Sequence, residues 1–138
     1  MSTIQLANNS TPLAQWVDEL FNKIFFQPDD TLATETFNEF VSPDLFARIN
    51  HSQLSHDQFL EALKQARGKE SMSVQASDEV HVWEAPDGSG AGCVAQLVRF
   101  TLTDKATGVE NKALNLTLAN VQVREGKRML VELTEVAN

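Results

Sequence analysis

The sequence of 138 residues has no tyrosine, a single cysteine and few basic side chains. Eleven Lys and Arg stand against nineteen Asp and Glu, which gives a formal net charge of -8, and the basic residues are scattered along the chain. Nucleic acids and anionic membranes are both bound by a concentrated basic face, so we expect neither as a partner. Cys93 alone excludes an internal disulfide, which fits a reducing compartment.

Long apolar runs are also missing. No stretch approaches the roughly 20 apolar residues that span a bilayer. The first ten residues lack the basic and apolar regions of a secretory signal. We therefore expect a cytoplasmic protein with a flexible tail at residues 1–10 and a single domain at residues 11–138. Hydrophobic residues make up 42% of the chain and include eight Phe, which is enough for a core of ordinary size.

Helical signals occupy the N-terminal half. Apolar residues recur at helical spacing in three segments, each of which opens with a capping residue. The first helix is predicted between Thr11 and Pro28, the second between Asp29 or Asp30 and Pro43, and the third between Ser55 and Gly68. Ser55 and Gln58 have the spacing of a capping box, and Gly68 is predicted to end the third helix.

From Ser71 onward the apolar period changes to two, which predicts strands at residues 71–83, 93–103, 111–124 and 128–136. Glu125-Gly126 is expected to form the tight turn of the last hairpin. Residues 44–54 are interpreted as a short β-arm. The predicted fold is α+β, with three N-terminal helices packed on a curved antiparallel sheet of about four long strands plus the β-arm.

Three segments carry a resemblance to a known family: FNEFVSPD, ARINHSQLSHDQFLEALKQARG and MLVELTEV. With this order of elements, the chain resembles the nuclear-transport-factor-2-like superfamily, the cystatin-like α+β cone, and within it the SnoaL-like branch. The resemblance implies a cone-shaped half-barrel, a pocket at its mouth and a homodimer through the outer sheet face. It also implies isomerase, cyclase or dehydratase chemistry by proton transfer, although the lack of tyrosine excludes an oxyanion hole built from that residue.

Three residues are candidates for acid–base chemistry: His51, Asp78 and Glu132. His51 lies in the β-arm, which the resemblance places near the pocket mouth, and its alternative is a surface turn residue. Asp78 interrupts a predicted strand, where a bulge could direct its carboxylate inward, and its alternative is a solvated kink. Glu132 is either a buried acid or an outer-face residue, because the register of the last strand stays open.

Four residues are predicted to line the pocket and bind ligand: Phe46, Trp83, Gln96 and Asn120. Gln96 interrupts the apolar row of Val94, Val98 and Phe100, and a polar residue in such a row needs a partner. Asn120 continues the row of Leu114, Leu116 and Leu118, which we expect to face the helices. The spacing of His and Cys gives no metal site, and no cofactor is expected.

The predicted function is a hydrophobic pocket for a small cyclic or polyketide/terpenoid-like molecule, with proton-transfer chemistry in the pocket. The alternative is a non-catalytic homodimeric binding or assembly module. Its interface would be the outer sheet face, predicted to comprise Ala113, Asn115, Thr117 and Ala119 together with Ala95, Leu97, Arg99 and Thr101.

Overall fold

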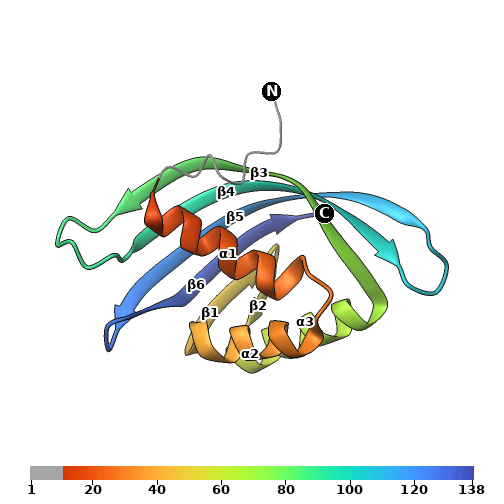
Figure 1. The fold of residues 1–138 in the computed structure, drawn as a ribbon, viewed down its shortest axis with the longest axis horizontal. Helices are drawn as coiled ribbons and strands as arrows, with labels where there is room; N and C mark the ends of the chain where they lie inside the picture. The colour runs from red at the N-terminus through yellow and green to blue at the C-terminus, as the bar shows by residue number, and fades with distance from the viewer. Residues whose placement is uncertain (1–10) are drawn as a thin grey trace.

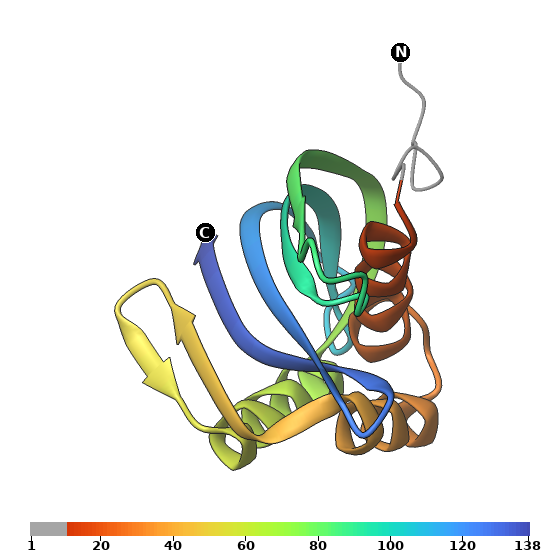
Figure 2. The same cartoon turned by 90° about the vertical axis from the view of Figure 1, so that its left-hand side faces the viewer.

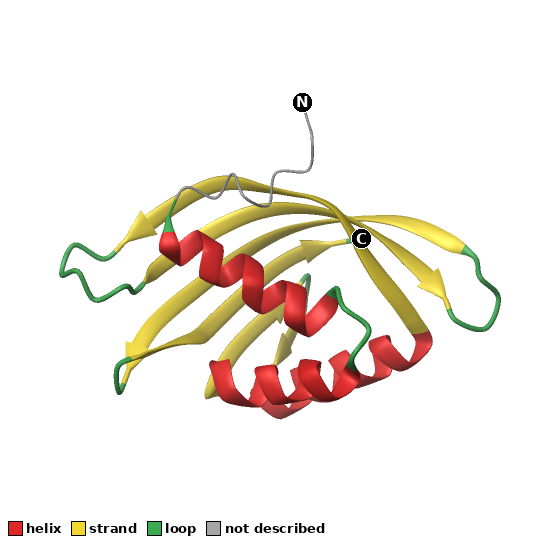
Figure 3. Ribbon diagram, viewed as in Figure 1, coloured by secondary structure: helices red, strands yellow, loops and turns green. Residues whose placement is uncertain are grey.

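The computed structural model describes residues 11–138, which form three helices and a six-stranded sheet (Figures 1 and 3). The helices are α1 (Pro12–Phe25), α2 (Asp30–Phe40) and α3 (His56–Lys69). The strands are β1 (Val41–Ile49), β2 (Ser52–Leu54), β3 (Glu70–Glu84), β4 (Gly92–Asp104), β5 (Glu110–Arg124) and β6 (Lys127–Ala137). The predicted α+β class is confirmed.

The predicted helix starts are confirmed by their hydrogen bonds. Thr11 caps α1 and Asp29 caps α2, each by accepting a backbone N–H bond with its side chain. Ser55 and Gln58 form the capping box of α3 in both directions. Each cap satisfies backbone donors that a helix leaves free in its first turn.

Two predicted helix ends are wrong. The second helix ends at Phe40 rather than near Pro43, because Val41 already begins β1 and is only 1% exposed. The third helix continues through Gly68 to Lys69. Glu70 follows it in an extended conformation, with φ -135 and ψ 150, so the chain enters β3 directly and needs no left-handed glycine there.

The sheet contains the four predicted long strands and two more. The expected β-arm is a hairpin of β1 and β2, and β1 pairs with β6 in parallel, so the strand order is β2-β1-β6-β5-β4-β3. All other neighbouring pairs are antiparallel. The predicted turn at Glu125-Gly126 is confirmed by positive φ angles of 54° and 77°.

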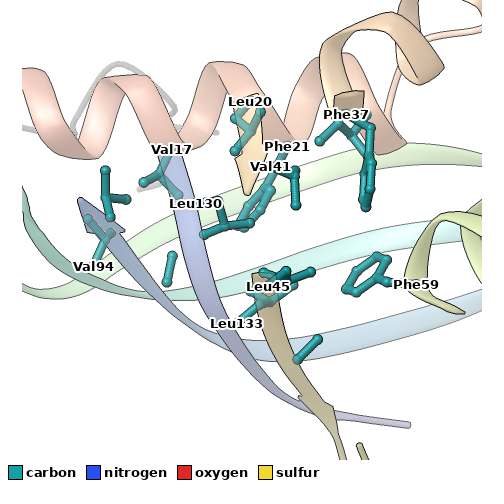
Figure 4. Close-up of a cluster of buried hydrophobic side chains, with 14 of the residues drawn as sticks. Val17, Leu20, Phe21, Phe37, Val41, Leu45, Phe59, Val94, Leu130 and Leu133 are labelled. Carbon is teal, nitrogen blue, oxygen red and sulfur yellow. The ribbon is translucent and has the colours of Figure 1, made fainter. Parts of the chain in front are cut away.

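The helices lie on one side of the curved sheet, and α1 packs against β3 and β4 (Figure 2). The main core fills the space between these layers (Figure 4). Its buried side chains include Val17, Leu20 and Phe21 from α1, Phe37 from α2, Phe59 from α3, and Val94, Leu130 and Leu133 from the sheet. Each large side chain buried in this way contributes roughly 1.5–3 kcal/mol.

Candidate functional site

The face of β5 that lies under the helices is the opposite of the predicted one. Thr117 is 2% exposed, whereas Leu116 and Leu118 are 38% and 49% exposed. The expectation that the leucine row faces the helices is therefore wrong, and Leu114 is exposed with the others. A period of two defines two faces of a strand but does not say which one is buried.

The pairing register of β5 with β4 explains which face of β5 is buried. Gln96 pairs with Thr117 and Leu97 pairs with Leu116, so the buried row of β4 continues into the small and polar side chains of β5. Aromatic rings from the end of α1 occupy the space above this part of β5, where the smaller side chains leave room for them. The predicted outer interface is thus wrong for the row that contains Thr117, while Leu97 does lie on the outer face.

A cavity of about 110 Å³ lies between the C-terminal end of α1 and the inner face of the sheet. Its walls are mostly apolar and its polar groups come from β5 and β6. The residues that line it are Phe21, Phe25, Phe26, Met72, Val98, Phe100, Asn115, Thr117 and Glu135. This is the composition of a small-molecule site, an apolar chamber with a few convergent polar groups.

Glu135 is the acid of this cavity. It pairs with Thr117 across β5 and β6, and the Thr117 hydroxyl donates to Glu135 Oε2 at 3.4 Å. Burial raises the pKa of the Glu135 carboxyl to about 7, although the bond from Thr117 acts in the opposite direction. A carboxyl with this pKa exchanges its proton near neutral pH, which suits general acid–base chemistry.

A wider hollow of about 630 Å³ adjoins the cavity and is lined by the β1–β2 turn, α3 and, again, Phe25 and Glu135. We call it the vestibule. Asn50 holds the turn in place, because its backbone N–H donates to the Glu135 carbonyl at 2.9 Å and its side chain bonds both backbone groups of Ala137. His51 follows Asn50 and lines the vestibule as an exposed residue. The structure thus brings His51 and Glu135 to one hollow.

A second acid of the interior lies on α1. Asp18 is 8% exposed and accepts hydrogen bonds from Ser77 at 3.0 Å and from Gln96 at 2.9 Å. Burial raises its pKa to about 6, against the effect of these two bonds, and Glu79 and Glu19 raise it further. Gln96 was predicted to be interior and to need a partner. The structure places it there, 1% exposed, with Asp18 as that partner.

The other predicted site residues lie on the outer face of the sheet, away from the cavity. Trp83 and Phe46 are 54% and 38% exposed. Asn120 donates to Glu132 Oε1 at 2.7 Å, and both line a shallow outer groove of about 280 Å³ with Trp83. The inward orientations expected for Phe46 and Asn120 are wrong, because Ala47 and Ala119 take the inner positions beside them.

Asp78 also lies on the outer side, where it is exposed and pairs with Leu97. The irregularities of β3 flank it, between Val74 and Ala76 and between Glu79 and His81, so the bulge does not direct its carboxylate inward. The open question about the last strand is settled by register: Glu132 pairs with Asn120 outside, and the acid inside the cone is Glu135.

Both interior acids, Asp18 and Glu135, had a signal in the sequence. Asp18 stands four residues after Ala14 and three before Phe21, on the apolar face of its helix. Glu135 stands two residues after Leu133 and therefore shares its strand face. A search for single acids on apolar faces would have found both residues.

Among residues 11–138 no group of three or more potential ligands is arranged to hold a metal ion. No helix in that range is long and apolar enough to cross a membrane.

This arrangement of three helices on one side of a curved sheet, with a chamber between them, is the nuclear-transport-factor-2-like fold, also described as cystatin-like. A ketosteroid isomerase-like protein from Erwinia carotovora atroseptica shares it with a TM-score of 0.70 and 15% identity, over 94% of this chain and 97% of that one. A protein from Xanthomonas campestris assigned as a calcium/calmodulin-dependent protein kinase II association domain has a TM-score of 0.70 and 16% identity, over 99% and 93%.

An assigned SnoaL-like polyketide cyclase from Jannaschia has a TM-score of 0.62 and 12% identity, over 95% of this chain and 91% of that one. At such identities these likenesses show a common fold, and the fold hosts many unrelated functions. No protein-family model matches the sequence, and no curated protein matches it either. The sequence-based resemblance is confirmed at the level of the fold.

Proposed function

We propose that this protein binds a small, neutral, cyclic molecule in the cavity beneath α1 and acts on it by proton transfer, with Glu135 as the acid and base. The observation that carries the proposal is Glu135 itself, a carboxyl with a pKa of about 7 in the wall of an apolar chamber. A neutral ligand fits because burial disfavours charge there and the phenylalanine rings around the chamber offer no counter-charge.

The size of the chamber limits the ligand. An apolar cavity of roughly 150 Å³ holds one benzene molecule, so the 110 Å³ cavity takes at most a single ring. The remainder of a larger cyclic or polyketide/terpenoid-like molecule would extend into the vestibule. A ketone or enone is the simplest such ligand, because ionised Glu135 can take the acidic proton next to its carbonyl and, once protonated, can donate to the enolate.

The proposed reaction moves one proton between the ligand and Glu135 and needs no other reactant. The ionised Glu135 carboxylate takes a proton from the carbon next to the ligand carbonyl, which leaves an enolate and a carboxylic acid. The acid then returns the proton to the same carbon or to another one, which gives exchange or isomerisation. His51 lies in the vestibule, where it could bond the part of the ligand that stays outside the chamber.

Deuterium exchange tests this proposal. We expect the wild-type protein in D₂O to bind 2-cyclohexenone, seen by saturation-transfer NMR, and to accelerate deuterium incorporation next to its carbonyl. Glu135→Gln should keep the fold and lower the exchange rate by about 10²- to 10⁴-fold, the usual contribution of a general base. Glu132→Gln is the matched control, because it makes the same change on the outer face of the same strand.

Two results would contradict the proposal. One is the absence of both binding and exchange with the wild-type protein across a set of cyclic ketones, enones and phenols. The other is an equal loss of exchange in Glu132→Gln and Glu135→Gln, since that would remove the link to the cavity.

A second candidate function is a homodimeric module, which is favoured by the apolar outer face of the sheet. Leu97, Leu116 and Val136 form one cross-strand row there, and Val136 is 62% exposed. Leu114 and Leu118 extend this outer leucine patch along β5. A second copy of the chain is the occupant we propose, because a two-fold contact buries the same patch on both copies.

A further inference from the structure

Three side chains on neighbouring strands form a polar row across the inner face. Gln96 of β4 pairs with Thr117 of β5, and Thr117 pairs with Glu135 of β6. Asp18 meets one end of the row by accepting a bond from Gln96 Nε2 at 2.9 Å. At the other end, the Thr117 hydroxyl donates to Glu135 at 3.4 Å. The row thus joins buried Asp18 to half-buried Glu135.

One acceptor in the middle of the row has no donor. Gln96 Oε1 is buried and no described residue gives it a hydrogen bond. At neutral pH the amide cannot turn round to relieve this, because its oxygen would then face the ionised Asp18 carboxylate, which accepts from the Nε2 donor in the present orientation. A buried acceptor left unpaired lowers stability, so a donor that reaches it is favoured.

Thr117 is the donor closest in the register. Directly paired residues of an antiparallel sheet have Cβ atoms about 4.5–5.5 Å apart. A hydroxyl rotation with a small side-chain adjustment can therefore aim the Thr117 proton at Gln96 Oε1 instead of at Glu135. The hydroxyl has one proton, so it serves only one of the two acceptors at a time.

We propose that Thr117 and Gln96 are positioning residues that favour the protonated, hydrogen-bond-donating form of Glu135. The inference rests on the role of Glu135 in the proposed function. When Glu135 is ionised, Thr117 donates to the carboxylate and Gln96 Oε1 stays unpaired. When Glu135 is protonated, its own O–H donates to Thr117 Oγ1, and the Thr117 proton is free to bond Gln96 Oε1. Gln96 Oε1 and Thr117 Oγ1 then each have a donor.

Few other titratable groups lie near Glu135 and could change its pKa. His51 of the β1–β2 turn is the other titratable residue among the described residues that line the cavity and the vestibule. Phe25 and Phe59 face the vestibule from α1 and α3 and carry no charge. Asp18 lies at the far end of the row, with Glu79 and Glu19 acting on it.

The test is the titration of Glu135, followed by carboxyl ¹³C NMR without any ligand. Gln96→Met keeps the size of the side chain and removes the acceptor, so the Glu135 pKa should fall. Gln96→Leu is a second variant with the same expected direction. In a Thr117→Val background, Gln96→Met should leave the Glu135 pKa unchanged, because the hydroxyl that connects the two residues is gone. Thr117→Ser should restore the effect.

The double variant distinguishes a hydrogen-bonded connection through Thr117 from an electrostatic effect of Asp18 on the Glu135 pKa. Gln96→Met also removes a donor to Asp18, and an effect transmitted through space would persist in the Thr117→Val background. Persistence there, or an unchanged Glu135 pKa in both Gln96 variants, would overturn the inference. Because the titration uses the unliganded protein, it can succeed even where the exchange experiment with 2-cyclohexenone fails.

Discussion

Asp18 lies on the apolar face of α1, where two side chains rather than solvent satisfy its carboxyl. Its pKa of about 6 is above the ordinary value of 3.8, and desolvation is the main cause. The folded chain therefore binds this proton more tightly than the unfolded chain does. The stabilisation that comes with the proton is full below about pH 4 and is lost as the pH rises through about 6.

Asp18→Asn should remove this pH dependence. The amide oxygen can still accept from Ser77 and Gln96, and the side chain no longer ionises. In urea denaturation at pH 7.5, we expect the free energy of unfolding of the variant to exceed that of the wild type by about 1–2 kcal/mol. This difference should vanish near pH 4. Glu61→Gln, which removes an exposed acid on α3 that does not act on Asp18, is the control. A difference between Asp18→Asn and wild type that does not vary with pH would contradict the assignment.

At the scale of elements, the sequence predicted those features that depend on interactions between residues close together in the chain. The caps of all three helices, the Glu125-Gly126 turn and the four long strands were read correctly, because each depends on a few neighbouring residues. The inner face of β5 was predicted wrongly. Whether Thr117 or Leu116 is buried depends on packing against the aromatic rings of α1, which are far away in the sequence. The same dependence on α1 explains why Asn120 was placed on the wrong face and why Glu135 was missed, although Gln96 was placed correctly.

Arg67 of α3 makes hydrogen bonds to α1 and α2 that the sequence analysis did not predict. Its side chain is buried and donates to Ile24 O at 3.0 Å, to Gln27 O at 2.7 Å and to Asp30 Oδ1 at 2.7 Å. It thereby satisfies carbonyls at the C-terminal end of α1 and ties that end to α2 and α3. These contacts lie directly beside the phenylalanine rings of the cavity.

Arg67→Met should lower the free energy of unfolding by about 2–4 kcal/mol, because it leaves two carbonyls unpaired. Asp30→Asn should cost less than about 1 kcal/mol, since Asp30 is largely exposed. Urea denaturation measures both, with Lys64→Met on the exposed side of α3 as the matched control. Equal effects of Arg67→Met and Lys64→Met would show that the buried guanidinium does not hold these helices together.

At the scale of the whole molecule, the apolar side chains divide between two surfaces. The inner face forms the core and the cavity, while the outer leucine patch remains uncovered in the single chain. Contiguous apolar patches beyond a few hundred Å² are unusual on monomers and mark interaction sites. The cavity lies on the other side of the sheet, so a dimer through the patch would leave its mouth open.

Leu116→Lys tests the dimer. Leu116 stands at the centre of the cross-strand row, between Leu97 and Val136, so a two-fold contact through the patch would bring two copies of it close together. We expect the wild type to sediment at twice the mass of the chain and Leu116→Lys at the mass of one chain, because two ammonium groups would be buried in an apolar contact. Asn111→Lys adds the same charge at an exposed position near the end of β5 and should leave the dimer intact. A wild-type monomer at tens of micromolar, or a dimer that survives Leu116→Lys, would remove this interface. Retained binding of 2-cyclohexenone by the monomeric variant would show that the cavity and the patch act independently.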